Sequence, residues 1–249
     1  MTTLEQTSIY SQETWDHEYQ DLEFRLPPYQ DQIRRWLTEW APKNKAGSCF
    51  EVGCFPGQYL AVFGEMGFEV NGADLTPRVF PEMANWLDSS GYKVGQIYRE
   101  DFLEFGKDKQ FDLVYSIGFI EHFKNWNELI EKHLDLTKPG GTVMIATPNF
   151  SGGLQRLLHK TLDEVNYDRH FIPSMDPDLW RRIIEQRGFK VLYCGYFFEY
   201  DFWIGVQKRT LFQKLAFWTI RALKPLLARV LPKNSRFASP YCGIVAVRV

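Results

Sequence analysis

Paired cysteines are missing from this sequence. No CxxC pair occurs, and no histidine lies at the spacing from a cysteine that zinc sites use. A disulfide framework is disfavoured as well, because it belongs to short secreted chains rather than to one of this length. We therefore expect no metal site, and we expect small buried thiols in a reducing compartment at Cys49, Cys54, Cys194 and Cys242.

Long apolar runs are also missing. No stretch approaches the roughly 18 consecutive apolar residues that indicate a membrane-spanning helix. Residues 1–14 are polar and lack the apolar segment that marks a secretory signal. The expected location is therefore the cytoplasm.

Acidic residues are absent after Asp201, although the whole chain has a formal net charge of only −2. An acidic body is thus followed by a basic C-terminal stretch, which is a candidate surface for an anionic partner. Nucleic acid is not expected as that partner, since no basic stripe follows the strands that would form a cleft. The basic residues are Lys208, Arg209, Lys214, Arg221, Lys224, Arg229, Lys233, Arg236 and Arg248.

Short apolar runs alternate with helical spacing through the middle of the chain. This alternation is typical of an α/β fold in which helices cover both faces of a doubly wound parallel sheet. Strands are predicted over 48–52, 69–73, 94–98, 111–116, 142–147, 191–200 and 241–249. Helices are predicted over 57–66, 77–89, 126–136 and from Asp176-Pro177 to about Gln186, with a turn at 138–141.

The turn after the first predicted strand carries the first chemical signal. It runs from Glu51 to Gly57 as E-V-G-C-F-P-G, and Asp74 ends the next strand. Glycine in such a turn lets a ligand approach backbone N–H groups, and a carboxylate about 20 residues further on can accept both hydroxyls of a ribose. A dinucleotide turn would read GxGxxG; bulky Phe55 and acidic Glu51 instead favour a ligand with a cationic amino group.

Further motifs follow this turn in order. Together they resemble the successive motifs of class I S-adenosylmethionine-dependent methyltransferases, over about residues 48–200 and the last strand. Each motif is weak alone, and the order and spacing make the set specific. The motifs are Glu51–Gly57, Gly72–Asp74, Glu100–Phe102, Phe111–Ser116 with Ile120–His122, and Lys138–Gly141.

The resemblance implies a Rossmann-like, seven-stranded fold whose last strand is antiparallel, and S-adenosylmethionine as cofactor. Asp74 would hold the ribose with Leu75 against the adenine, and Asp101 would accept the adenine amino group with Phe102 beside it. Phe55 stands where the family usually has a small residue, so either the backbone is shifted or the ring closes over the cofactor. The methionine part would be surrounded by Glu51, Gly53, Cys54 and Gly57, with Ser116, Ile117 and Gly118 under the ligand.

We expect a single domain with decorations. Residues 1–46 form a helical N-terminal cap, 48–200 the core, 201–240 a basic insertion with its own helix, and 241–249 the final strand. The cap, the insertion and residues 148–175 would form a lid over the site. These segments should determine the methyl acceptor, because the fold itself does not.

Two histidines are candidate general bases. His122 follows the fourth strand on the edge where α/β sheets bind ligands, and its ordinary pKa suits proton removal near neutral pH. His170 lies in the segment expected to border the acceptor, where Asp168 could orient it. The alternative for His122 is a structural role at the start of a helix, and for His170 a loop hydrogen bond to backbone.

The insertion predicts an amphipathic helix over 210–231. At 100° per residue, Lys214, Arg221, Lys224 and Arg229 share one face, and apolar residues cover much of the rest. Residues 208–236 could therefore contact an anionic membrane or a phosphorylated carrier. The alternative is a lid helix packed on the domain with a solvated basic edge; Pro225 should bend or restart the helix in either case.

We therefore interpret the chain as a methyltransferase acting on a small molecule, most simply at oxygen. A glycan, a lipid-linked molecule and an aromatic metabolite all remain open as acceptors, and the oligomeric state is open too. Two alternatives are an NAD(P)-dependent oxidoreductase on a similar sheet and an inactive cofactor-binding relative that binds a partner through its insertion.

Overall fold

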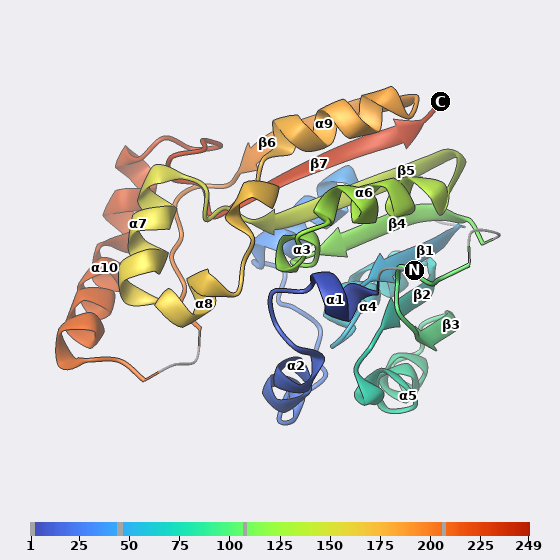
Figure 1. Ribbon diagram of the computed structural model, residues 1–249, viewed down its shortest axis with the longest axis horizontal. Helices are drawn as coiled ribbons and strands as arrows, with labels where there is room; N and C mark the ends of the chain where they lie inside the picture. Colours follow the sequence, from blue (N-terminus) through green and yellow to red (C-terminus); the bar gives the residue numbers. More distant parts are fainter. Residues whose placement is uncertain (1–2, 44–46, 107–108, 206–207) are drawn as a thin grey trace.

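The apolar runs assemble into one mixed sheet. The computed structural model describes residues 3–43, 47–106, 109–205 and 208–249, so parts of the predicted cap and insertion lie outside the described residues. The described strands are ordered β3-β2-β1-β4-β5-β7-β6, and β7 is antiparallel to both β5 and β6 (Figure 1), which confirms the predicted fold. Their bounds are β1 Ser48–Val52, β2 Glu69–Asp74, β3 Val94–Arg99, β4 Phe111–Ile117, β5 Thr137–Pro148, β6 Phe189–Phe197 and β7 Tyr241–Arg248.

Helices bury both faces of the sheet. On one face pack α3 (Gln32–Trp40), α4 (Gln58–Glu65) and α5 (Glu82–Ser89), through a cluster that includes Trp36, Phe63 and Met83. On the other face pack α6 (Trp126–Asp135) and α9 (Pro177–Gln186), through Leu129 and Trp180. Burial on two sides explains why the central strands read as continuous apolar runs.

Two local predictions need correction. Residues 77–89 were predicted as one helix, but a 3-10 turn at Pro77–Val79 precedes α5, because Pro81 has no N–H to continue a helical ladder. The Lys-Pro-Gly-Gly turn lies inside β5, where the pairing with β4 shifts from Phe111–Thr137 to Leu113–Thr142. The predicted turn is therefore an irregularity within a strand, which Gly140 permits through its positive φ of 75°.

The N-terminal cap lies against the carboxyl edge of the sheet. Its first helices are α1 (Leu4–Thr7) and α2 (Gln12–Tyr19). The segment between them pairs with the chain after β4: the Ile9 N–H donates to the His122 carbonyl at 2.8 Å, and the Lys124 N–H to the Thr7 carbonyl at 3.0 Å. Residues far apart in sequence are thus joined at the edge where the site forms.

Two segments, one between β5 and α9 and the other between β6 and β7, form a second helical region. It contains α7 (Gly153–Leu162), α8 (Glu164–Asp168), a 3-10 turn η3 (Ile172–Ser174) and α10 (Leu211–Val230), and Figure 1 shows α7, α8 and α10 grouped beyond one end of the sheet. The helix α10 continues through Pro225, which excludes a restart at that residue, and the alternative of a bend there stays a prediction. Among the described helices, none combines the length and the apolar character needed to cross a bilayer.

Candidate functional site: a cofactor cavity beside a histidine and carboxylate cluster

A cavity opens at the carboxyl ends of β1 to β4, under the N-terminal cap. It lies at the edge of the sheet where α/β folds usually bind their ligands. Its sheet side is lined by Gly53, Phe55, Ala73, Asp74, Leu75, Glu100, Phe102, Ile117, Gly118, Phe119, His122 and Phe123. Its cap side is lined by Leu4, Glu5, Ser8, Tyr10, Gln12, Trp15 and Tyr19.

The turn after β1 requires glycine at its first position. Gly53 has a φ of 68°, and a Cβ on it would lie 2.4 Å from the ring of Phe119. The N–H groups of Gly53 and Cys54 both donate to the Ala73 carbonyl, which ties the turn to the end of β2. The turn therefore brings backbone close to the cavity where a larger residue would be strained.

Asp74 ends β2 and lines the cavity. Its carboxylate accepts the Thr76 N–H at 2.9 Å and the Phe55 N–H at 3.1 Å, so both oxygens are oriented and still have lone pairs available. Burial raises the pKa of Asp74 to about 6, and the backbone donors partly oppose this shift. The geometry fits the predicted acceptor of a ribose diol.

Phe55 connects the turn to the cap. Its ring lines the cavity, lies 4.9 Å from the ring of Tyr19 and 5.8 Å from that of Phe24, and is 6% exposed. The sequence left two alternatives for Phe55, a shifted backbone or a ring that closes over the cofactor. The ring contacts with the cap fit the second alternative. An aromatic residue here holds the cap by ring contacts that glycine would not provide.

Four predicted cofactor residues lie behind the cavity wall rather than on it. Glu51 is 3% exposed and accepts a hydrogen bond from the Tyr115 hydroxyl at 3.1 Å, and burial raises its pKa well above the usual range. Cys54 packs against Gly72, Gly57 begins α4 with a φ of 79°, and Ser116 is fully buried. Their ligand contacts stay predictions.

Asp101 accepts two backbone hydrogen bonds, and its predicted contact with the adenine amino group stays a prediction. One carboxylate oxygen accepts the Leu4 N–H and the other accepts the Leu103 N–H, both at 2.8 Å. Asp101 does not line the cavity, whereas its neighbour Glu100 does. The described contacts thus assign Asp101 to anchoring the cap at α1.

The cap residues on the cavity wall were not singled out from the sequence. Trp15 and Tyr19 fall in the segment predicted to be a helical cap, but helical character does not tell which side of a helix meets a site. Three segments were predicted to form a lid: the cap, residues 148–175 and residues 201–240. Among their described residues, only those of the cap line the cavity. The described part of 201–240 instead packs α10 against α7, through Phe217 and Ile220 among others.

His122 and His170 meet beside the cavity. Their ring centroids are 4.7 Å apart, and only His122 lines the cavity, with Trp15 edge-on to it at 4.8 Å. His122 Nδ1 lies 3.0 Å from the Arg169 carbonyl, and His170 Nδ1 lies 2.5 Å from the Asn166 carbonyl. Asp168 was predicted to orient His170, so this backbone contact corrects the partner.

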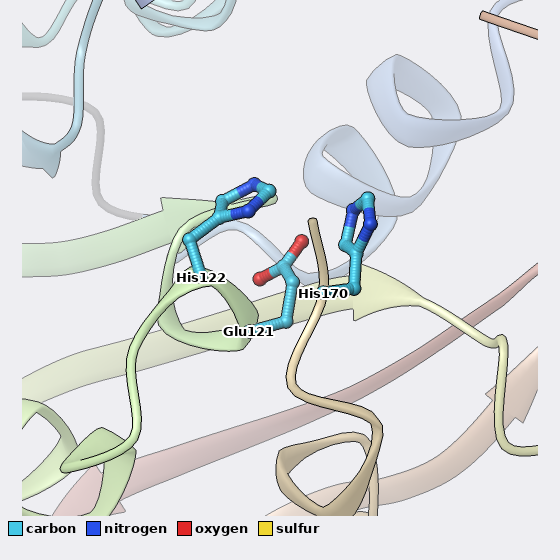
Figure 2. Close-up of side chains that lie close together, drawn as sticks. All are labelled: Glu121, His122 and His170. Atoms are coloured by element: carbon cyan, nitrogen blue, oxygen red, sulfur yellow. The ribbon is translucent and has the colours of Figure 1, made fainter. Parts of the chain in front are cut away.

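Burial keeps both imidazoles neutral near pH 7. It lowers the pKa of His122 to about 4 and that of His170 well below the usual range. Glu121 is enclosed between them (Figure 2), and burial without a hydrogen-bond partner raises the pKa of its carboxyl to about 8. Glu121 was identified in the sequence only as part of a motif.

The fold is that of class I S-adenosylmethionine-dependent methyltransferases. A solved S-adenosylmethionine-dependent methyltransferase from Archaeoglobus fulgidus aligns with a TM-score of 0.58 at 20% identity, over 87% of this chain and 93% of that one. Magnesium protoporphyrin IX methyltransferase from Synechocystis, solved with bound S-adenosylhomocysteine, aligns with a TM-score of 0.56 at 13% identity, over 96% and 95%.

The sequence pattern of the family described as "Methyltransferase domain" matches residues 23–193, so the chain belongs to that family and its cofactor is S-adenosylmethionine. The oxidoreductase alternative is thereby excluded. Among curated relatives, ubiquinone biosynthesis O-methyltransferases from Rickettsia felis and Cereibacter sphaeroides are 27% and 29% identical over 99 and 101 residues. Each match covers 40% of this chain and 40% of the relative.

Proposed function

We propose that this protein methylates a hydroxyl oxygen of a small molecule that carries an aromatic ring and an apolar tail. The observation that carries the proposal is one cavity with two chemically distinct walls. Asp74 and the Gly53 turn, at β2 and β1, suit a nucleoside with an amino acid part. His122, Trp15 and Tyr10 form an aromatic wall beyond the end of β4.

The cofactor supplies, when bound, a methyl group that is already electrophilic. The protein must therefore orient an acceptor and exclude water, and orientation alone can supply roughly 7–11 kcal/mol. Aromatic rings of the cap, at Tyr10, Trp15 and Tyr19, cover the cavity and suit a flat acceptor. His122 lies at this wall as a neutral imidazole that can accept a hydrogen bond from a hydroxyl.

Oxygen is favoured as the acceptor atom by the curated relatives, whose names state O-methylation in ubiquinone biosynthesis. That name also supports a lipid-linked aromatic acceptor over a glycan. The test is transfer of a labelled methyl group from S-adenosylmethionine to a panel of phenols and catechols, with and without a prenyl or alkyl tail. Turnover of tailed phenols above tailless ones is expected.

A negative panel separates two explanations. If S-adenosylhomocysteine binds but no phenol, sugar or amine is methylated, the inactive partner-binding alternative gains support and the proposed activity is wrong. If amines or sugars are turned over in place of phenols, the methyl transfer stands and the acceptor assignment fails.

We further propose that α10 rests on an anionic membrane. The face of α10 that does not pack on α7 carries unusually exposed apolar side chains, from 45% at Leu223 to 84% at Leu211, and Trp218 is 63% exposed. Its predicted basic residues are exposed as well, and only Lys224 has an ion-pair partner among the described acids, Asp201 at 2.7 Å. Exposed apolar and cationic side chains on one helix suit a bilayer interface better than a solvated edge.

Vesicle flotation tests this contact. Wild-type protein should bind vesicles with anionic phospholipid and lose binding in high salt, since each basic residue near such a surface contributes about 1 kcal/mol. Lys214→Glu with Arg221→Glu should weaken binding at least about 100-fold, whereas Lys190→Glu, an exposed site on β6, is the matched control. Equal binding to neutral vesicles, or binding only to a trace phosphorylated lipid carrier, contradicts the proposal.

A further inference from the structure

Glu121, His122 and His170 form a compact set of potential metal ligands. One ligand atom from each residue can be chosen so that all lie within 4.8 Å of one another. Figure 2 shows the Glu121 carboxylate between the two imidazole rings, with Glu121 and His122 on one short turn and His170 on a separate segment. Glu121 and His170 are 49 residues apart in the sequence, and the three side chains still meet at one point.

The two histidines are oriented as metal ligands usually are. Each Nδ1 faces a backbone carbonyl, of Arg169 for His122 and of Asn166 for His170. A carbonyl can only accept, so each Nδ1 carries the proton and each Nε2 keeps its lone pair. Metal-binding histidines typically donate their second ring N–H to such an oxygen, which fixes the tautomer and the ring.

The carboxylate between them has no partner. Glu121 is 0% exposed, and neither of its side-chain oxygens has a hydrogen bond to any residue that the structure describes. A buried carboxylate is costly unless it is paired, hydrogen-bonded or bound to a metal. Among the described residues, no ion pair reaches Glu121, and the guanidinium of Arg169 pairs instead with Glu18 at 2.6 Å.

The segments that hold the three residues are fixed to each other. The Phe171 N–H donates to the Glu121 carbonyl at 2.6 Å, beside the contact between His122 Nδ1 and the Arg169 carbonyl. The three residues also border the cavity. His122 lines it, and so does Gly118, which lies close to Glu121: a Cβ added to Gly118 would be 3.5 Å from Glu121 Oε1. A bound ion would therefore have its open positions near the acceptor end.

We propose that Glu121, His122 and His170 bind a divalent transition-metal cation at the acceptor end of the cavity. Two imidazoles and one carboxylate suit Zn²⁺ or Fe²⁺ and leave coordination positions open. From the lack of paired cysteines we expected no metal site. The proposed site replaces that expectation. The search for cysteine and histidine spacing overlooks ligands that only folding brings together.

The role of the ion rests on the proposed function. A cation here would hold the acceptor hydroxyl oxygen and lower its pKa, so that the proton passes to solvent as the oxygen gains the methyl group and S-adenosylhomocysteine remains. This step needs no redox change. It also removes the need for His122 to act as a strong base, which its burial disfavours.

The first experiment is metal binding by the wild-type protein. Untagged protein is stripped with a chelator and titrated with Zn²⁺ by calorimetry and with Co²⁺ by visible absorption. One equivalent should bind, with Co²⁺ bands of nitrogen and oxygen coordination and no thiolate charge-transfer band. Absence of stoichiometric binding by folded protein that still binds S-adenosylhomocysteine overturns the proposal, and Glu121 is then a buried neutral acid.

Variants then locate the ion. Mutation of a residue that only supports a metal ligand typically weakens metal binding ~10–100-fold. Loss of a ligand itself, in Glu121→Gln or His170→Gln, should weaken Zn²⁺ binding by more than that. The matched control is His133→Gln: His133 is also buried with its Nδ1 near a backbone carbonyl, that of Leu129, and it lies outside the cluster. Retained S-adenosylhomocysteine affinity in each variant shows that folding is intact.

The metal site and the proposed activity can fail separately. Metal binding with no turnover on phenols leaves the site standing and refutes the O-methylation proposal. Turnover that survives in stripped wild-type protein and in Glu121→Gln refutes a role for the ion in the reaction. Equal Zn²⁺ affinity in the wild type, Glu121→Gln and His170→Gln places the ion elsewhere and refutes the assignment.

Discussion

The affinity for the cofactor should fall in mild acid because of one carboxyl group. Asp74 lines the cavity, and its pKa is raised to about 6 by burial. A ribose diol donates hydrogen bonds, so it needs the ionised form of Asp74 as acceptor. Protonation of the free protein below that pKa then competes with binding, whereas above it the carboxylate is already formed and affinity should be level.

The size of the effect follows from the pKa. A carboxyl of pKa about 6 is roughly 90% protonated at about pH 5 and roughly 10% at about pH 7, so the Kd should rise about tenfold between them, or ~1.4 kcal/mol. Calorimetric titration with S-adenosylhomocysteine at constant ionic strength measures this. Near-ultraviolet circular dichroism at each pH verifies that the fold is unchanged.

Asp74→Asn is the decisive comparison. Asparagine keeps one acceptor oxygen but does not titrate, so its affinity should be lower at neutral pH and nearly independent of pH. Glu51 also has a raised pKa, and any part of the pH dependence that it causes would persist in Asp74→Asn. If the variant shows the same tenfold change as the wild type, the assignment of Asp74 is wrong.

Three further changes test how the cap and the C-terminal region are held. Phe55→Ala should raise the S-adenosylhomocysteine Kd about 10–100-fold, because two ring contacts of ~0.5–1.5 kcal/mol each are lost; unchanged affinity in calorimetry contradicts closure by Phe55. Asp101→Ala should expose residues near Leu4 to limited proteolysis about tenfold faster, since a cap hydrogen bond contributes ~1 kcal/mol; unaltered cleavage would mean that Asp101 does not anchor α1. Arg209→Ala should lower the free energy of unfolding in urea by ~3–5 kcal/mol by leaving buried Asp163 without its guanidinium, while exposed Arg229→Ala stays within ~0.5 kcal/mol; equal losses would refute the pairing.

The sheet could be predicted from the sequence because its signal is local. Strands such as β1 and β4 are buried on two faces, so each one reads as an apolar run whatever its neighbours are. The failures are local as well. At Pro81 the backbone chemistry outweighed helical spacing, and at Gly140 the pairing of β5 with β4 absorbed residues that resemble a turn.

The cofactor side of the cavity was predictable because its sequence signal is also local. Gly53 follows β1 directly and Asp74 is the last residue of β2, and the carboxyl ends of parallel strands meet at one edge of the sheet. Which acid of a pair faces the cavity is less predictable: Glu100 lines it, while Asp101 turns to the cap. Both residues follow the last residue of β3, Arg99, so strand alternation does not set the direction of their side chains, and the contacts of the loop do.

The acceptor side depends on contacts that sequence spacing does not encode. Hydrogen bonds of Ile9 and Thr7 with residues 122–124 help to hold the cap at the site, and the bond from the Phe171 N–H to the Glu121 carbonyl helps to hold His170 near Glu121. His122 is held from both sides, at its backbone carbonyl by the Ile9 N–H and at its ring by the Arg169 carbonyl. Movement of the cap should therefore alter the proposed ligand set and the cofactor cavity together, which makes the cap the element that links cofactor binding to the acceptor end.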